Sequence, residues 1–163
     1  MSKKIFITLG SQKFQFNRLL KAIDELCEKK IVNENDVFAQ IGYSDYSPQN
    51  YNYKKFLDRD EFGLEMGKAE IVITHGGTGA IIGAVKKGKK VIAVPRRAKY
   101  GEHVDDHQLE LVRQFRDLQL ICECDDIKKI GEALRMVENT TYKDYVSNTQ
   151  KIINSIEKFI ENK

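Results

Sequence analysis

The sequence contains no long apolar run. Its apolar stretches stay far below the roughly 18 residues that a membrane-spanning helix needs. The first of them, residues 5–9, follows Met1-Ser2-Lys3-Lys4 and is too short for a secretory signal. These absences argue against a spanning or exported protein. We therefore expect a cytoplasmic protein, which another protein would have to hold at any membrane where it works.

Cysteine is scarce, and neither sign of charge is in large excess. The three cysteines, Cys27, Cys122 and Cys124, include no Cys-x-x-Cys pair, so neither a disulfide framework nor a metal site is expected. The 27 Lys and Arg residues against 24 Asp and Glu residues leave a net charge of +3. This mild excess permits contact with phosphates. It falls short of a nucleic-acid-binding pattern, because the lysines are scattered among acids.

Short apolar runs alternate with stretches whose apolar residues recur at helical spacing. The runs predict strands at 5–9, 37–41, 51–57, 71–74, 91–94 and 120–122. The helical spacing predicts helices at 15–30, 62–69, 78–87, 104–116, 126–138 and 141–161. Strands that alternate with helices pair in parallel through right-handed crossovers. We predict an α/β fold with one Rossmann-like, doubly wound parallel sheet of about six strands.

The chain shows no internal repeat, low-complexity tract or linker. Residues 1–163 are therefore expected to form a single domain. The last predicted helix carries an apolar stripe made of Ile152, Ile153, Ile156, Phe159 and Ile160. Such a stripe on an amphipathic helix usually packs against the core.

The strongest local motif follows the predicted strand at 71–74. It consists of five consecutive residues: His75, Gly76, Gly77, Thr78 and Gly79. Glycines let the backbone curl and present N–H groups, and the helix that follows adds its free amides and positive dipole end. Such a turn binds a diphosphate. The alternative is a tight turn without a ligand.

Glycine spacing alone does not identify the ligand. Gly77, Gly79 and Gly83 also match a pattern seen in NADP-binding domains, and Arg96 and Arg97 end the next strand, where an arginine meets a 2′-phosphate. Two observations argue against this alternative. The motif follows a mid-chain strand, and no second domain is apparent to hold a hydride acceptor.

A second polar motif spans residues 101–108. The side chains in it that are able to take part in binding or catalysis are Glu102, His103, Asp106, His107 and Gln108. One interpretation is a polar helix start, in which an acid caps free amides. Another is a metal site from two histidines one turn apart, although the zincin glutamate is missing. The third is a cluster that hydrogen-bonds sugar hydroxyls, because ligands of such sheets bind beyond the carboxyl ends of the strands.

Gly10 and Ser11 form the turn after the first strand. Gly10 would let the backbone approach a partner chain or an acceptor molecule. An ordinary glycine turn explains the same residues equally well.

The ordered set of motifs resembles the C-terminal domain of glycosyltransferase family 28. The resemblance rests on residues 72–79, 88–96 and 101–108, with further similarity at 8–11 and 16–20. Within the family, the chain is most similar to small bacterial subunits of capsule and exopolysaccharide glycosyltransferases. These subunits resemble the cytosolic catalytic subunit of the eukaryotic dolichol-linked N-acetylglucosamine transferase.

The resemblance implies a GT-B fold divided between two chains. This chain would be the C-terminal half, which binds a UDP-sugar as substrate without a cofactor or metal. A membrane-anchored partner would bring the lipid-linked saccharide acceptor and recruit the chain to the inner face of the membrane. Nucleic acid is not an expected partner.

The resemblance also assigns roles to particular residues. The turn from His75 to Gly79 would hold the donor diphosphate. Contacts to the donor sugar or nucleoside would come from Arg96, Glu102, Asp106, His107 and Gln108. The general base would lie on the partner or, on this chain, at His103, because imidazole titrates near neutral pH. Gly83 stands where many members carry a ribose-binding carboxylate, so Glu102 or the partner would contact the ribose.

Three hypotheses therefore remain at the level of sequence. The first is a UDP-hexose-dependent transferase subunit that has little activity without its partner. The second is an NADP-dependent oxidoreductase. The third is a non-catalytic subunit that stabilises a membrane transferase.

Overall fold

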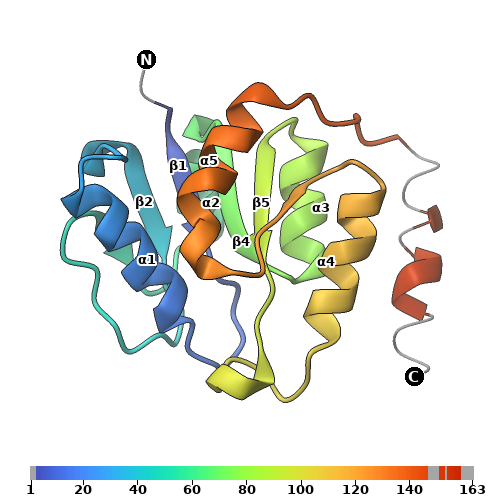
Figure 1. The fold of residues 1–163 in the computed structure, drawn as a ribbon, viewed down its shortest axis with the longest axis horizontal. Coiled ribbons are helices and arrows are strands. Elements are labelled where there is room, and N and C mark those ends of the chain that lie inside the picture. Colours follow the sequence, from blue (N-terminus) through green and yellow to red (C-terminus); the bar gives the residue numbers. More distant parts are fainter. Residues whose placement is uncertain (1–2, 147–150, 153, 159–163) are drawn as a thin grey trace.

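The computed structural model describes residues 3–146, 151–152 and 154–158. Its centre is a six-stranded parallel sheet in the order β3-β2-β1-β4-β5-β6 (Figure 1). The strands are β1 (Ile5–Thr8), β2 (Val37–Gln40), β3 (Asn52–Lys54), β4 (Ile71–His75), β5 (Lys90–Val94) and β6 (Cys122–Glu123). This order is the doubly wound arrangement of Rossmann-like domains. The fold class predicted from the sequence is confirmed.

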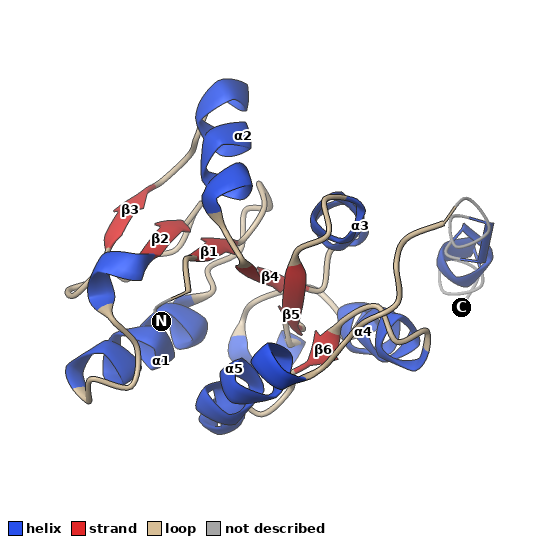
Figure 2. Ribbon diagram, turned by 90° about the horizontal axis from the view of Figure 1, so that it is seen from above, coloured by secondary structure: helices blue, strands red, loops and turns tan. Residues whose placement is uncertain are grey.

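Five α-helices cover the sheet. They are α1 (Asn17–Glu28), α2 (Arg59–Lys68), α3 (Thr78–Lys86), α4 (His107–Asp117) and α5 (Ile130–Asn139). Helices α1 and α5 pack on one face of the sheet, and α2, α3 and α4 pack on the other (Figure 2). Among the helices in the described ranges, none is both long and apolar enough to cross a bilayer.

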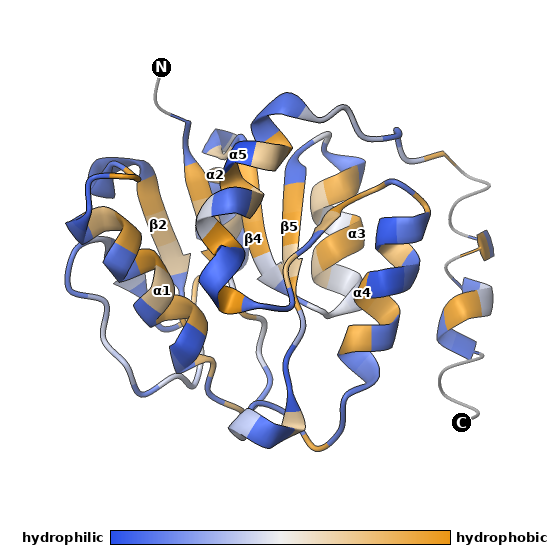
Figure 3. Ribbon diagram, viewed as in Figure 1, coloured by the Kyte–Doolittle hydropathy of each residue, from blue (hydrophilic) through white to orange (hydrophobic). Residues whose placement is uncertain are grey.

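The strand sequences explain the two-sided core. Successive side chains of a strand point to opposite faces, so Ile71 and Ile73 pack toward α1 and α5 while Val72 packs toward α3. A parallel sheet covered on both faces reads as a continuous apolar run, and the central strands β4 and β5 are mainly orange in Figure 3. Blue and orange residues alternate along helices α1, α4 and α5 in Figure 3, as expected of amphipathic helices that cover a core.

Element boundaries differ from the prediction where strands lie at an edge. The strand predicted at 51–57 is shortened to β3, whose three residues are all exposed. The strand predicted at 120–122 is displaced to Cys122–Glu123, although Leu120 and Ile121 are buried in the core. An apolar run marks burial reliably, but it does not mark which residues pair with a neighbouring strand.

Two predicted helices are wrong in part. The helix predicted from residue 104 begins at His107, and Val104 is 75% exposed. Acidic side chains in 102–106 bond to loop groups, and such bonds compete with helix formation. Residues 141–146 of the last predicted helix are not helical; they run past α3 and α4, where Lys86 Nζ lies 5.0 Å from the centre of the Tyr145 ring.

The rest of the last predicted helix is helical where it is described, at 151–152 and 154–158. The expected apolar stripe is only partly visible there. Ile152 is exposed and Ile156 is half-buried, so neither is a core residue. Ile153, Phe159 and Ile160 lie outside the described residues.

Residues 43–50 form a polar loop after β2, and one buried acid holds it. Asp24 on α1 accepts hydrogen bonds from the backbone N–H groups of Gln49 and Asn50 at 2.9 and 3.0 Å and from the Tyr46 hydroxyl. Desolvation and this bond raise the pKa of Tyr46 to about 12. The loop after β2 is therefore fastened to α1.

Candidate functional site

The sheet order reverses between β1 and β4, and the chemistry of the chain gathers at the carboxyl ends of these two strands. Such a switch point is where doubly wound sheets bind ligands. Gly10 follows β1 with a φ of +72°, which favours glycine, and His75 ends β4. Both turns lie along the lower edge of the sheet in Figure 1.

Helix α3 opens directly onto this switch point. Its N-cap residue is Gly77, and no side chain caps the helix. The first N–H groups of a helix have no partner within it, and the dipole makes this end positive. The glycine turn therefore leads into an uncapped helix end, the backbone arrangement that suits an anion, and the predicted diphosphate site stays a prediction.

Two glycines make room for the His75 ring. A Cβ at Gly77 would lie 2.2 Å from His75 Cε1, and a Cβ at Gly10 would lie 2.6 Å from His75 Nε2. Atoms this close overlap, so the ring fits between the two turns only because both residues lack a side chain. Gly76 meets a similar limit, since its Cβ would lie 2.7 Å from Gln108 Cβ. The glycines thus make room for neighbouring side chains and also leave the backbone N–H groups of the turn uncovered.

Gly77→Ala is therefore expected to destabilise the protein by about 1–3 kcal/mol, the usual cost of overpacking. Gly79→Ala is the matched control in the same turn, because a Cβ at Gly79 has no atom within 4 Å. Urea unfolding of the two variants measures the difference. Equal stability of both variants would mean that the ring moves aside without cost.

Gln108 connects the turns after β4 and β5. Its Oε1 accepts hydrogen bonds from the N–H groups of Gly76 and Arg96, both at 3.1 Å. Its Nε2 lies 3.4 Å from His75 Nδ1. Gln108 is buried, and in this conformation its amide bonds to the protein itself.

His75 is buried at the centre of this arrangement. Desolvation, with a smaller effect of the Arg96 charge, lowers the pKa of His75 to about 3. The ring is therefore neutral at physiological pH. Of the predicted diphosphate-binding residues, Gly79 is exposed, Gly77 and Thr78 are half-buried, and His75 and Gly76 are buried.

Arg96 does not face a ligand site. It is 1% exposed, and its guanidinium donates to the carbonyl oxygens of Leu9 at 2.7 Å and Phe14 at 3.1 Å. Further bonds reach the carbonyl oxygens of Gln15 and Glu102. Burial lowers the pKa of Arg96 to about 10. In this structure Arg96 ties the turn after β1 to the loop after β5, and its contact with a nucleoside or 2′-phosphate stays a prediction.

Glu102 is also internal. It is fully buried, and its carboxylate accepts bonds from Arg18 Nε at 2.9 Å, Arg18 Nη2 at 3.0 Å and the Arg97 N–H at 3.0 Å. Its contact with ribose or sugar likewise stays a prediction, because the carboxylate bonds to the protein itself in this structure. We call Arg18, Arg96 and Glu102 the loop clasp, because together they hold the loop over residues 95–103.

The second arginine is paired at the surface. Arg97 Nη1 donates to both carboxylate oxygens of Asp125 at 2.8 and 3.0 Å, and Arg97 Nε lies 3.4 Å from Asp106 Oδ1. These partners raise the pKa of Arg97. With Arg96 buried and Arg97 paired, neither arginine is free to meet a 2′-phosphate, which counts against the NADP alternative.

Asp106 accepts a hydrogen bond from the Ala98 N–H at 2.9 Å, which lowers the pKa of its carboxyl group. The acid that bonds to an amide at the start of α4 is instead Asp105, which accepts from the His107 N–H at 3.1 Å. The prediction of an acid at this helix start is confirmed for Asp105 and not for Asp106.

His103 and His107 both lie beside Asp105. The distances from their Nδ1 atoms to the Asp105 carboxylate oxygens are 3.3 and 3.5 Å. The His103 ring also packs on Phe14 with a centroid separation of 5.4 Å. Over the described part of the chain, no group of three or more His, Cys, Asp or Glu side chains is arranged to hold a metal ion.

A pocket of about 260 Å³ lies between the glycine turn and the start of α4. Its lining combines Gly76, Gly77, Thr78, His103, His107 and Gln108 with Gln12, Leu111 and Glu157. The two predicted motifs therefore share one pocket. Gly10 and Ser11 are not among its lining residues, although Gly10 packs on His75 from the neighbouring turn and Ser11 is exposed.

Several residues of the site were not predicted. Arg18 lies 84 residues from Glu102 in the sequence, and no local pattern links them. Glu157 reaches the pocket from the C-terminal helical segment, which the apolar stripe suggested would pack on the core. Both contacts join distant parts of the chain, so neither motif nor periodicity reveals them.

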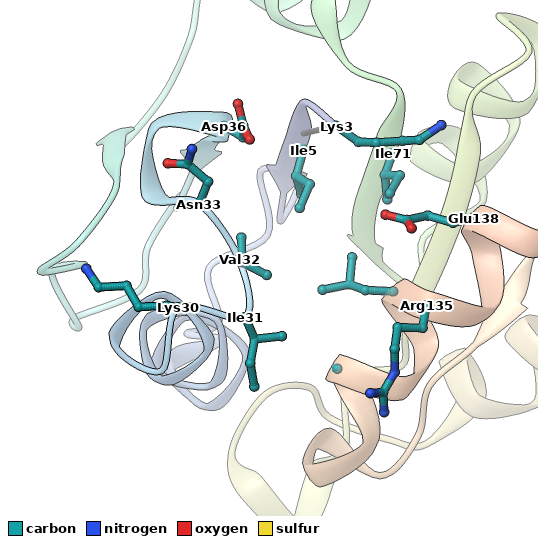
Figure 4. A pocket seen from close by; sticks show the side chains of 12 residues that line it. Lys3, Ile5, Lys30, Ile31, Val32, Asn33, Asp36, Ile71, Arg135 and Glu138 are labelled. Atoms are coloured by element: carbon teal, nitrogen blue, oxygen red, sulfur yellow. The ribbon is translucent and has the colours of Figure 1, made fainter. Parts of the chain in front are cut away.

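A larger hollow of about 390 Å³ lies at the opposite, amino-terminal edge of the sheet (Figure 4). Ile5 and Ile71 form its floor, and it is bordered by Arg135 and Glu138 of α5. Its lining combines apolar side chains such as Val32 with charged side chains of both signs such as Lys30 and Glu138. Among the described residues that line this hollow, none belongs to a turn of consecutive glycines like that at 75–79.

The fold and site define a Rossmann-like domain with a glycine turn and an uncapped helix N-terminus at its switch point. A model of the glycosyltransferase family 28 C-terminal domain matches residues 4–162, and the chain belongs to this family. The resemblance seen in the motifs is thereby confirmed.

Known proteins support the same assignment. The human UDP-N-acetylglucosamine transferase subunit ALG13 is 29% identical over 119 residues, which cover 69% of this chain and 10% of the human protein. This chain thus spans only about a tenth of that relative's length.

Two solved structures share the fold. The NMR solution structure of ALG13 has a TM-score of 0.60 and 16% identity, with coverage of 88% of this chain and 89% of that chain. The crystal structure of Acinetobacter baumannii MurG has a TM-score of 0.59 and 16% identity, with coverage of 97% and 50%. The domain has the fold of the C-terminal half of a GT-B glycosyltransferase, as predicted.

Proposed function

We propose that this chain is the donor-binding, catalytic subunit of a two-chain glycosyltransferase. The proposed reaction moves a hexose from a UDP-sugar to a lipid-linked saccharide in capsule or exopolysaccharide biosynthesis. Family membership and similarity to a protein named as a UDP-N-acetylglucosamine transferase subunit support this proposal. The observation that carries it is the glycine turn at the switch point, where α3 presents uncapped amides beside His75.

The donor diphosphate is proposed to lie on residues 75–79. Negative charge develops on the leaving UDP during transfer, and fixed N–H donors at a helix N-terminus stabilise such charge without reorganising. In this mechanism the chain positions the donor and stabilises the charge on the leaving group. The UDP-sugar is the substrate, and we propose no cofactor or catalytic metal.

The donor sugar is proposed to contact Asp106 and His107. Both side chains are about half exposed at the mouth of the pocket or beside it. Arg96, Glu102 and Gln108 are proposed to act indirectly, because their polar groups already bond to the loops that shape the pocket.

The general base is proposed to come from the partner, with His103 as the candidate on this chain. His103 lines the pocket, and its Nδ1 is 3.3 Å from the Asp105 carboxylate. A carboxylate in this position orients an imidazole and supports the protonated form that a base becomes.

A membrane-anchored partner is proposed to supply the acceptor and the missing wall of the site. The pocket is smaller than the roughly 300–1,000 Å³ typical of ligand sites. Large apolar side chains on loops beyond the carboxyl ends of the strands are exposed: Tyr43, Phe56, Tyr100 and Val104. Exposed apolar groups around a half-formed site favour a protein partner at this edge, with Gly10 and Ser11 on the same side. The partner would hold the cytoplasmic chain at the inner membrane face.

A titration of the full chain with UDP, followed by NADP at equal concentration, tests the donor site. We expect UDP to shift the backbone amide NMR signals of residues 76–79 and of 102–108, because the N–H groups of the turn face the diphosphate. Amides beside Ile31 at the opposite edge are the internal control. Shifts with NADP and none with UDP would overturn the proposal.

Transfer activity tests the two-chain arrangement. The chain alone should be nearly inactive, and co-expression with its partner should restore transfer from a UDP-sugar. Full activity of the isolated chain on soluble acceptors would contradict a divided enzyme. Full activity of a complex that carries His75→Ala and His103→Gln would indicate a non-catalytic, stabilising subunit instead.

A further inference from the structure

The orientation of the Gln108 amide follows from its neighbours. Two backbone N–H groups, those of Gly76 and Arg96, point to the same side-chain atom at 3.1 Å. Backbone N–H groups only donate, so this atom is the oxygen. The NH₂ group of Gln108 is therefore the group that lies 3.4 Å from His75 Nδ1.

This contact determines where His75 carries its proton. An amide NH₂ donates and does not accept, so Nδ1 of His75 must accept and is unprotonated. A neutral imidazole then carries its proton on Nε2. Burial lowers the pKa of His75, and the charge of Arg96 and the nearby His103 lower it further.

The protonated edge of the ring faces the switch point. Nε2 lies against the turn after β1, where a Cβ at Gly10 would be 2.6 Å away. Within the described ranges, Nε2 makes no hydrogen bond to another protein group. A donor at the edge of an anion-binding turn is thus left for a ligand.

We propose that Gln108 is a positioning residue that fixes His75 as the neutral Nε2–H tautomer, so that His75 serves as a hydrogen-bond donor to a ligand oxygen. In this state Nε2 already holds a proton and does not accept one, so His75 is not the base of the reaction. A neutral donor also binds an unprotonated phosphate oxygen without the cost of burying a cation. The identity of the ligand as a nucleoside diphosphate rests on the proposed function.

Nitrogen NMR of ¹⁵N-histidine-labelled full-length protein tests the proposal without ligand. The ¹⁵N shifts of protonated and unprotonated ring nitrogens are well separated, and His103→Gln and His107→Gln assign the three rings. We expect His75 to show a protonated Nε2 and an unprotonated Nδ1 throughout about pH 5–8. A protonated Nδ1, or a ring that titrates in this range, would overturn the proposal.

Gln108→Glu is the decisive variant. One carboxylate oxygen still accepts from Gly76 and Arg96, while the other replaces the NH₂ group with an acceptor. His75 should then move its proton to Nδ1 or become charged, a change that a purely structural role would not produce. An unchanged Nε2–H signal in this variant would contradict the assignment. Should the variant not fold, the wild-type spectrum alone decides.

Addition of UDP separates this inference from the proposed function. If UDP shifts the amides of 76–79 and also the His75 Nε2 signal, both stand. If UDP shifts those amides and leaves Nε2 unchanged, the donor role of His75 is wrong and the proposed function remains. If UDP does not bind, the proposed ligand is wrong, while the tautomer measured without ligand still decides the role of Gln108.

Discussion

Replacing Glu102 by alanine is expected to lower the free energy of unfolding by about 3 kcal/mol, the scale for removing one member of a buried ion pair. The substitution leaves Arg18, whose side chain is only 16% exposed, without its carboxylate. It also removes the acceptor of the Arg97 N–H, which lies 3.0 Å from Glu102 Oε1. Urea unfolding followed by circular dichroism measures the loss as a lower midpoint at an unchanged slope.

Asp117→Ala is the matched control for this prediction. Asp117 also pairs with an arginine, Arg116, at 3.0 Å, but its side chain is 61% exposed. Exposed ion pairs contribute little, so this variant should unfold near the wild-type midpoint. A Glu102→Ala protein that is as stable as Asp117→Ala would show that the loop clasp does not stabilise the fold.

The loop clasp illustrates what sequence reasoning finds and what it does not. Glu102 is identified from its place beyond the end of β5, in a loop where ligands of such sheets bind. The position is right, but the direction of the side chain is not. Whether an acid in a polar loop faces water or the interior depends on a distant partner, and Arg18 is 84 residues away.

The sheet is predictable because its signals are local. An apolar run in β4 with a glycine turn behind it specifies a buried strand, a turn and a helix, and the sequence alone carries all three. The predicted boundaries of helices are wrong where other interactions compete with the helix. At residues 104–106 acidic side chains bond to the loop backbone, and at 141–146 the chain packs on α3 and α4 by way of Tyr145.

The glycine turn shows a second limit. The sequence marks Gly77 as a residue of a phosphate-binding turn, which is a statement about backbone freedom. The structure adds that a side chain at Gly77 would collide with the His75 ring. That constraint depends on the position of the ring between the turns after β1 and β4, and so it follows only from the fold.

The stability of the protein is expected to fall steeply as pH is lowered toward 5, because His75 is held neutral in the folded state. Its folded pKa is about 3, against roughly 6.5 in the unfolded chain. Between these values the unfolded state binds one proton more, so stability is present above about pH 6.5 and is lost as pH falls toward 3. From pH 7 to pH 5 this one group accounts for a loss of about 2 kcal/mol.

His75→Asn removes this contribution, because an amide does not titrate in this range. The variant is expected to be less stable overall, since Asn fills less of the space between Gly10 and Gly77. The informative quantity is the slope, and the free energy of unfolding of the variant should depend less on pH between 5 and 7. His107→Gln is the control, because this exposed position leaves His75 in place. The free energy of unfolding of this variant should depend on pH between 5 and 7 as it does in the wild type. Equal slopes in wild type and His75→Asn would mean that the ring becomes protonated in the folded protein. The carboxyl ends of the strands would then accommodate a cation where the structure has a neutral donor.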